Sequence, residues 1–234
     1  MPLSTIAFDA DDTLWENEKI FKLTEKRFLE LLYDHGADES LYDHLLETER
    51  QNLRYYGYGI KGFTLSMVET AIRITNGTVP AHIIQEILNA GREMHDHPAE
   101  PMAGVTETLK QLAGTYRILL ITKGDLFDQE RKLAQSGLGE LFDGVEIVSE
   151  KTEETYLRIF EQYGDGPKRS MMVGNSLKSD IVPAVAVGAW GVHVPSEIEW
   201  AMEKADAPTG NARYHHLETI TELPALIAEI SADN

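Results

Sequence analysis

The order of apolar segments constrains the fold of this chain more than any other feature. From about residue 97 onward, short apolar runs alternate with stretches of helical periodicity. This alternation predicts strands separated by helices, and hence an α/β fold with a parallel sheet covered on both faces. The predicted strands are residues 118–121, 145–148, 171–173 and 191–194, followed by 214–217; helices are predicted near residues 104–112, 125–135, 155–163, 179–187 and 223–230.

The part of the chain before residue 97 has a different pattern. Residues 6–8 form a short apolar run that ends at Asp9, as expected for a first strand of the same sheet. In residues 16–96 the apolar positions recur at helical spacing, which predicts four helices and no strand. We therefore predict a sheet-containing core made of residues 1–15 and 97–234, interrupted by an all-helical domain of residues 16–96.

Composition narrows the range of partners and locations. The 234 residues include 21 Lys and Arg against 39 Asp and Glu, a net charge of −18, which argues against nucleic acid and anionic membranes as partners. There is no cysteine, so disulfides and thiolate metal sites are excluded. Because no run resembles a signal peptide or a membrane span, we expect a cytoplasmic protein.

Two carboxylates follow the first predicted strand directly. Asp9 and Asp11 are separated by one residue, and the carboxyl ends of parallel strands are where α/β sheets bind ligands. Two carboxylates this close favour a hard divalent cation or a shared proton. The alternative is an ordinary turn, in which Asp bonds its own backbone.

The next predicted strand ends in groups that suit an anion. Thr122 offers a hydroxyl, Lys123 an ammonium, and Gly124 a backbone amide that a ligand can approach closely at the start of a helix. For Thr122 the alternative is a simple helix N-cap.

Polar residues also follow two further strands. Lys151 comes after residues 145–148, and Asn175 and Asp180 come after residues 171–173. A solvated surface charge is the alternative for Lys151, and a helix cap is the alternative for Asp180. A single site at one edge of the sheet explains these residues more economically than four unrelated local roles.

Taken in order, these motifs resemble the haloacid dehalogenase-like superfamily, of the phosphatase type. The matching positions are Asp9-x-Asp11-x-Thr13, Thr122, Lys151 and Gly174-Asn175-x-x-x-x-Asp180. The resemblance covers the whole chain and implies a Rossmann-like core. It also implies that residues 16–96 are a helical cap, inserted after the first strand, that closes over the site and recognises the leaving group.

The resemblance implies a role for each motif in phosphoryl transfer. Asp9 would be the nucleophile that forms an aspartyl-phosphate, and the Asp11 side chain would be the general acid and base. Mg²⁺ would be bound by Asp9, the main-chain carbonyl of Asp11, Asp180 and Asn175. The phosphoryl oxygens would be held by Thr122, Lys123, Gly124 and Lys151.

Two positions depart from the usual pattern of the superfamily. Asn175 stands where an acidic residue is common, and its amide can ligate Mg²⁺ or orient a ligated water but adds no charge. Asp12 replaces the Gly that commonly follows the second Asp, at a tight turn where Asp is better tolerated than most residues.

The sequence therefore predicts Mg²⁺-dependent hydrolysis of a small phosphorylated metabolite by a monomer or homodimer. One alternative is a metal-independent 2-haloacid dehalogenase, in which Asp11 would have little to do. Another is a phosphate-accepting signalling module, for which the helical insertion has no evident purpose. A binding protein without activity would not be expected to retain Asp9, Asp11, Lys151 and Asp180 together. With a net charge of −18, a phosphate substrate requires a local reversal of sign, which a bound cation and the lysines would supply.

The helical insertion contains one distinctive segment. Residues 55–63 include three glycines and four aromatic residues, together with Lys61. They form either a substrate-contacting loop, in which Lys61 offsets substrate charge, or a connection whose aromatic residues pack between helices.

Overall fold

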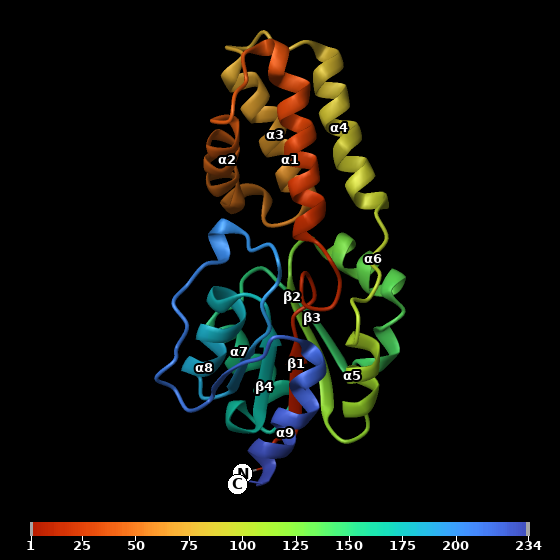
Figure 1. Ribbon diagram of the computed structural model, residues 1–234, viewed down its shortest axis with the longest axis vertical. Coiled ribbons are helices and arrows are strands. Elements are labelled where there is room, and N and C mark those ends of the chain that lie inside the picture. The colour runs from red at the N-terminus through yellow and green to blue at the C-terminus, as the bar shows by residue number, and fades with distance from the viewer. Residues whose placement is uncertain (1, 233–234) are drawn as a thin grey trace. The chain divides into compact units, whose positions relative to one another are not determined.

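The computed structural model describes residues 2–232 of the chain. Within them, six strands form one parallel sheet in the order β3-β2-β1-β4-β5-β6, which confirms the predicted α/β fold (Figure 1). The strands are β1 (Thr5–Phe8), β2 (Arg117–Lys123), β3 (Gly144–Val148), β4 (Ser170–Gly174), β5 (Trp190–His193) and β6 (Tyr214–His216).

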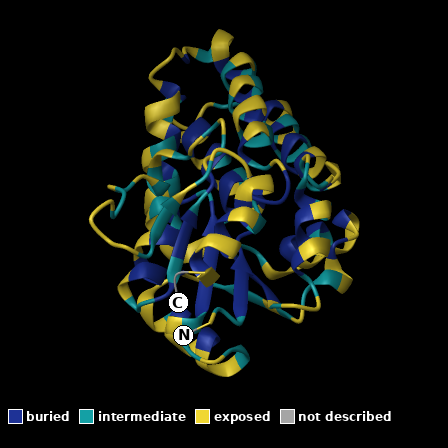
Figure 2. Ribbon diagram, turned by 60° about the horizontal axis from the view of Figure 1, so that its bottom comes forward, coloured by how far each residue is buried: buried dark blue, intermediate teal, exposed yellow. Residues whose placement is uncertain are grey.

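The central strands β1 and β4 are fully buried and β2 is buried over residues 118–122, as continuous apolar strands covered on both faces predict (Figure 2). In the central strand β1, Ile6 and Phe8 point to one face and Ala7 points to the other. The first face packs against α5 (Val105–Leu112) and α9 (Leu223–Ala232), and the second packs against α7 (Glu153–Tyr163) and α8 (Val182–Ala186).

The four helices predicted for the insertion are all present. A further helix, α6 (Leu126–Ser136), follows β2. The four helices of the insertion are α1 (Glu18–Leu32), α2 (Leu41–Tyr56), α3 (Ile60–Ile74) and α4 (Ala81–Asp96). Their apolar faces share one core, which includes Phe28, Leu45, Met67 and Ile87. Among the described residues, no helix is long and apolar enough to cross a membrane.

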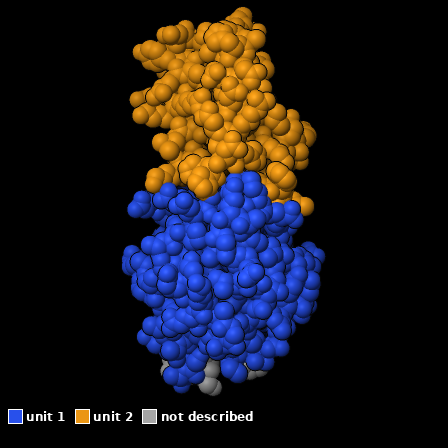
Figure 3. Space-filling view, turned by 90° about the vertical axis from the view of Figure 1, so that its right-hand side faces the viewer, with its two compact units in different colours: residues 1–18, 99–123, 130–234 blue, residues 19–98, 124–129 orange. Residues whose placement is uncertain are grey.

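The chain divides into two compact units, coloured separately in Figure 3. The sheet unit comprises residues 1–18, 99–123 and 130–234, and the helical unit comprises residues 19–98 and 124–129. The sequence analysis placed residues 124–129 in the core. They group with the helices because Lys61 pairs with Asp125 at 2.9 Å and His95 lies 3.3 Å from Asp128.

Candidate active site

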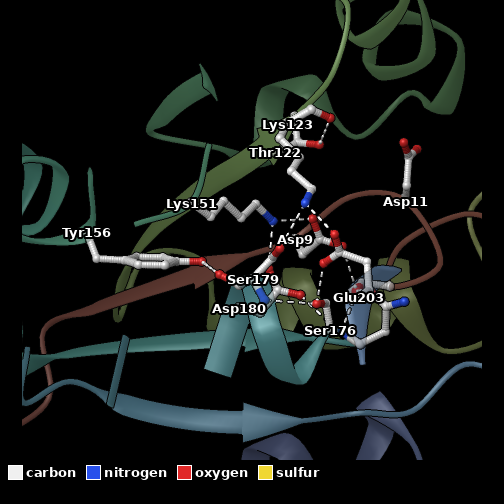
Figure 4. A network of polar contacts seen from close by, with 12 residues as sticks. Asp9, Asp11, Thr122, Lys123, Lys151, Tyr156, Ser176, Ser179, Asp180 and Glu203 are labelled. Atoms are coloured by element: carbon white, nitrogen blue, oxygen red, sulfur yellow. Dashed lines mark hydrogen bonds and ion pairs between the residues drawn. The ribbon is translucent and has the colours of Figure 1, made fainter. Parts of the chain in front are cut away.

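The ends of adjacent parallel strands bring most of the predicted site residues of the sheet unit together (Figure 4). Asp9 follows β1, Thr122 and Lys123 close β2, and Asn175 follows β4. Because β1 pairs in parallel with β2 and with β4, these three strands end at the same edge. Strand β3, which precedes Lys151, lies parallel beside β2. The backbone N–H of Asp9 donates to the carbonyl of Val173 at 2.9 Å and ties the first loop to β4.

A buried lysine bridges two buried carboxylates at the centre of this cluster. Lys151 Nζ donates to Asp9 Oδ1, and to Asp180 Oδ1 at 2.7 Å. The side chains of Lys151 and Asp180 are each 1% exposed, so these charges are desolvated. Burial and the negative charge of Asp180 raise the pKa of Asp9 to about 7, although Lys151 opposes the shift. Burial disfavours the Lys151 cation, but the two carboxylates outweigh it and raise the pKa of Lys151.

The loop after β4 is shaped to hold Asp180. A Cβ atom at position 174 would lie 2.3 Å from Asp180 Oδ2, so only glycine leaves room for the carboxylate. The same oxygen accepts the backbone N–H of Ser176 at 3.0 Å. The Tyr156 hydroxyl donates to the carbonyl of Ser179 at 3.0 Å and supports the loop from α7.

Thr13 joins the first loop to the loop after β4. Its hydroxyl oxygen lies 3.0 Å from Asp9 Oδ2 and 3.2 Å from Asn175 Oδ1, and it accepts the backbone N–H of Asn175 at 3.1 Å. Asn175 therefore lies beside the nucleophile candidate, with its amide oxygen next to a hydroxyl.

The carboxylate of Asp11 is turned away from the Asp9 cluster (Figure 4). It accepts the indole N–H of Trp15 at 2.7 Å and two hydrogen bonds from Lys132 Nζ, at 3.0 and 3.1 Å. Lys132 also donates to Asn17 Oδ1 at 2.7 Å. The sequence analysis missed Lys132, because nothing in the local sequence distinguishes a helical lysine that pairs with a distant carboxylate from one that lies in solvent.

Asp12 occupies the tight turn that the sequence analysis assigned to it. Its φ of 60° lies in the left-handed region, which Asp tolerates better than most residues. Its carboxylate accepts the backbone N–H groups of Asn17 and Glu18 at the start of α1. Burial nevertheless raises the pKa of Asp12 to about 6.

Lys123 is held by residues that the sequence analysis did not select. Its Nζ donates to Ser179 Oγ at 2.8 Å and to Glu203 Oε1 at 2.5 Å. The other Glu203 oxygen, Oε2, accepts the hydroxyl of Ser176 at 2.5 Å. Glu203 lies in a short 3₁₀ turn, Ala201–Glu203, in the long connection between β5 and β6, where no motif marks it.

Two of the predicted phosphate-binding residues differ in their placement. Thr122 is 1% exposed at the end of β2, within the cluster drawn in Figure 4. Gly124 belongs to the helical unit, where its φ of 138° is open to few residues other than glycine.

The segment of residues 55–63 is mostly helical. Tyr55 and Tyr56 end α2, Ile60 begins α3, and the connection between the helices is three residues long. Tyr55 is 67% exposed, whereas Phe63 is buried in the helical core. Some aromatic residues of the segment therefore pack in the helical core and others are exposed to solvent. Lys61 pairs with Asp125.

The donor set at the strand ends fits Mg²⁺. Among residues 2–232, no three His, Cys, Asp or Glu side chains are arranged to hold a metal ion. Mg²⁺ keeps several waters, however, and needs only one or two protein carboxylates. Asp9 and Asp180 are close enough for one ammonium group to contact both. This oxygen-only pair, with Asn175 nearby, suits a small hard cation.

Comparison with known families gives one match over most of the chain. The model of the haloacid dehalogenase-like hydrolases matches residues 3–188. A curated relative, a glyceraldehyde 3-phosphate phosphatase from Methanothermobacter thermautotrophicus, is 29% identical over 84% of this chain and 87% of its own length.

Solved structures agree with this match. A haloacid dehalogenase-like family hydrolase from Xanthomonas campestris is 40% identical, with a TM-score of 0.87 over 99% of this chain and 93% of that one. The HAD-hydrolase YfnB from Bacillus subtilis, solved with bound magnesium, shares the fold at 15% identity, with a TM-score of 0.67 over 97% of this chain and 99% of its own.

Proposed function

Because the chain belongs to the haloacid dehalogenase-like hydrolase family, we propose that it hydrolyses a small phosphomonoester with the help of Mg²⁺ and through an aspartyl-phosphate on Asp9. The curated relatives support a phosphatase: besides the archaeal glyceraldehyde 3-phosphate phosphatase, they include an N-acylneuraminate-9-phosphatase from Homo sapiens at 24% identity. Each of these names describes that protein's substrate, and for this chain the class of small phosphorylated metabolite follows by analogy.

One observation carries the proposal: Lys151 Nζ contacts both Asp9 and Asp180 in a buried cluster at the strand ends. A carboxylate attacks a phosphate dianion poorly unless cations hold the two together. A buried lysine on one oxygen of Asp9, with a second carboxylate beside it, provides that environment. The burial and pairing of Asp9 support its assignment as the nucleophile rather than as a surface charge.

Mg²⁺ bound by Asp9, Asp180 and the region of Asn175 would neutralise charge on the transferring phosphoryl group. The magnesium in the YfnB structure supports this choice of metal. In the first step Asp9 attacks phosphorus, and Asp11 gives a proton to the departing alkoxide. In the second step Asp11 takes a proton from the water that attacks the aspartyl-phosphate. Thr122 and Lys151 hold phosphoryl oxygens in both steps.

The test is turnover of p-nitrophenyl phosphate with Mg²⁺ and after chelation by EDTA. We expect activity only with the metal, and a fall of at least about 10³-fold in kcat for Asp9→Asn. Asp34→Asn, at an exposed position in the helical unit, is the matched control and should behave as the unaltered protein. Full activity of Asp9→Asn, or turnover only of 2-chloropropionate without metal, contradicts the proposal.

A further inference from the structure

Glu203 is an acidic residue at a site expected to bind phosphate, where a further negative charge needs a reason. Its side chain is 12% exposed and that of Lys123 is 14% exposed, so their ion pair is mostly shielded from water. Burial favours the protonated acid, but Lys123 and the hydroxyls of Ser176 and Ser179 outweigh it and hold the pKa of Glu203 below its ordinary value. The carboxylate is therefore charged at neutral pH.

The contacts of Glu203 connect two predicted parts of the site. Through Oε1 it reaches Lys123 at the end of β2, and through Oε2 it reaches Ser176 in the loop that carries Asp180 (Figure 4). Ser176 Oγ in turn accepts the backbone N–H of Ser179, and Ser179 Oγ accepts from Lys123. This closed ring fixes the position of the Lys123 ammonium.

The turn that carries Glu203 is itself attached to the same loop. Lys178 Nζ donates to the carbonyl of Met202 at 2.8 Å, next to the contact between Glu203 and Ser176. The segment around residues 201–203 is thus tied to the loop after β4 at two adjacent points. A carboxylate held in this way stays in place beside Lys123 rather than sampling solvent.

The two lysines of the cluster are each paired with carboxylates, and the pairing of Lys123 affects how strongly the site attracts phosphate. Asp9 and Asp180 share the charge of Lys151, while Glu203 lies on Lys123. Without Glu203, the full charge of Lys123 would act on a phosphate anion in a site of low dielectric, where such attraction is strong. A hydrolase that holds inorganic phosphate tightly is inhibited by its own product, because the product then occupies the site and leaves slowly. Binding substrate and product equally tightly also does not speed the chemical step.

We propose that Glu203 is a positioning residue that holds Lys123 in place and offsets its charge, so that the site binds phosphate weakly enough to release it. The inference rests on the proposed function and adds a role for a residue outside the sequence motifs. The effect of Glu203 on phosphate affinity therefore depends on Lys123.

The experiment is a double-mutant cycle read out by the binding of inorganic phosphate, using calorimetry in the presence of Mg²⁺ and inhibition of p-nitrophenyl phosphate turnover. Glu203→Gln keeps the shape and removes the charge. We expect it to bind phosphate about tenfold more tightly, with lower KM and lower kcat as product release slows. In a Lys123→Met background Glu203 loses the cation that keeps its largely shielded carboxylate charged, so the same substitution should change phosphate affinity less than twofold.

Glu197→Gln is the matched control, because Glu197 is exposed on the same segment and its substitution changes net charge equally. It should leave phosphate affinity unchanged. Unaltered affinity in Glu203→Gln, or the same tenfold gain in the Lys123→Met background, overturns the inference. Either result, with aryl phosphate turnover intact in the unaltered protein, leaves the proposed function standing, whereas absence of that turnover refutes the proposed function itself.

Discussion

The strand-end cluster and the core formed by helices α1, α2, α3 and α4 bury different kinds of side chain. At the strand ends, the buried groups include the charged residues Asp9, Lys151 and Asp180. Within residues 19–98, the buried polar side chains are all uncharged, and several are paired with one another or with a helical carbonyl, as Thr70 is with Thr48. The helical core is otherwise apolar, built on residues such as Met67 and Ile87.

This difference separates the residues that stabilise the fold from the residues that we propose to react. Burying charge costs free energy unless every group is paired, whereas burying apolar surface stabilises directly. A substitution at the strand ends should therefore destabilise the protein when it leaves a buried charge without its partner. Substitutions in the helical core should follow the volume that is removed.

The largest effect is expected for Lys151→Met. The substitution leaves two buried carboxylates without their shared cation, which costs about 3–5 kcal/mol, and it should reduce kcat at least about 10³-fold. Urea unfolding in EDTA measures the stability, and p-nitrophenyl phosphate turnover measures the activity. Adding Asp180→Asn should restore most of the stability and none of the activity. If Lys151→Met alone unfolds at the same urea concentration as the unaltered protein, charge pairing does not govern the stability of the cluster.

In the helical unit, Ile87→Ala should lower the free energy of unfolding by about 2–5 kcal/mol, because it removes a fully buried side chain and leaves a cavity. Ile72→Ala is the matched control. Ile72 is 46% exposed on α3, so its loss should cost less than about 1 kcal/mol. Equal losses for the two variants, measured by urea unfolding, would show that the helical core is not closely packed around Ile87.

The two regions also differ in how much of them could be predicted from sequence. The four helices of the insertion follow from apolar periodicity alone, because a helix that buries one face must repeat its apolar residues at 3.6-residue spacing. The sheet follows from short apolar runs, and the cluster of Asp9, Lys151 and Asp180 follows from the rule that parallel strands end at one edge.

What could not be predicted depends on contacts between distant residues. Lys132 and Asp11 are 121 residues apart in sequence, and Lys123 and Glu203 are 80 apart. Neither Lys132 on α6 nor Glu203 in an irregular connection has a local pattern that distinguishes it from a surface charge. The orientation of Asp11 toward Trp15 and Lys132 likewise depends on side-chain packing, which the order of motifs does not determine.

The smallest effect is expected for Lys132→Met, and it depends on the substrate. Lys132 donates two hydrogen bonds to the Asp11 carboxylate. If Asp11 is the general acid we propose, loss of Lys132 should lower kcat about 10- to 100-fold for a substrate with a poor leaving group. Glycerol phosphate has such a leaving group, whereas p-nitrophenolate departs without a proton. The fall in kcat should therefore be several times larger for glycerol phosphate.

Lys132→Arg should recover part of the kcat lost with glycerol phosphate, and Lys110→Met, at an exposed lysine of α5, should lose none. An equal loss of kcat on both substrates would mean that Lys132 supports the fold rather than Asp11. A loss confined to the alkyl phosphate would instead extend the proposed site beyond the strand ends, to a buried lysine on α6 that acts through Asp11.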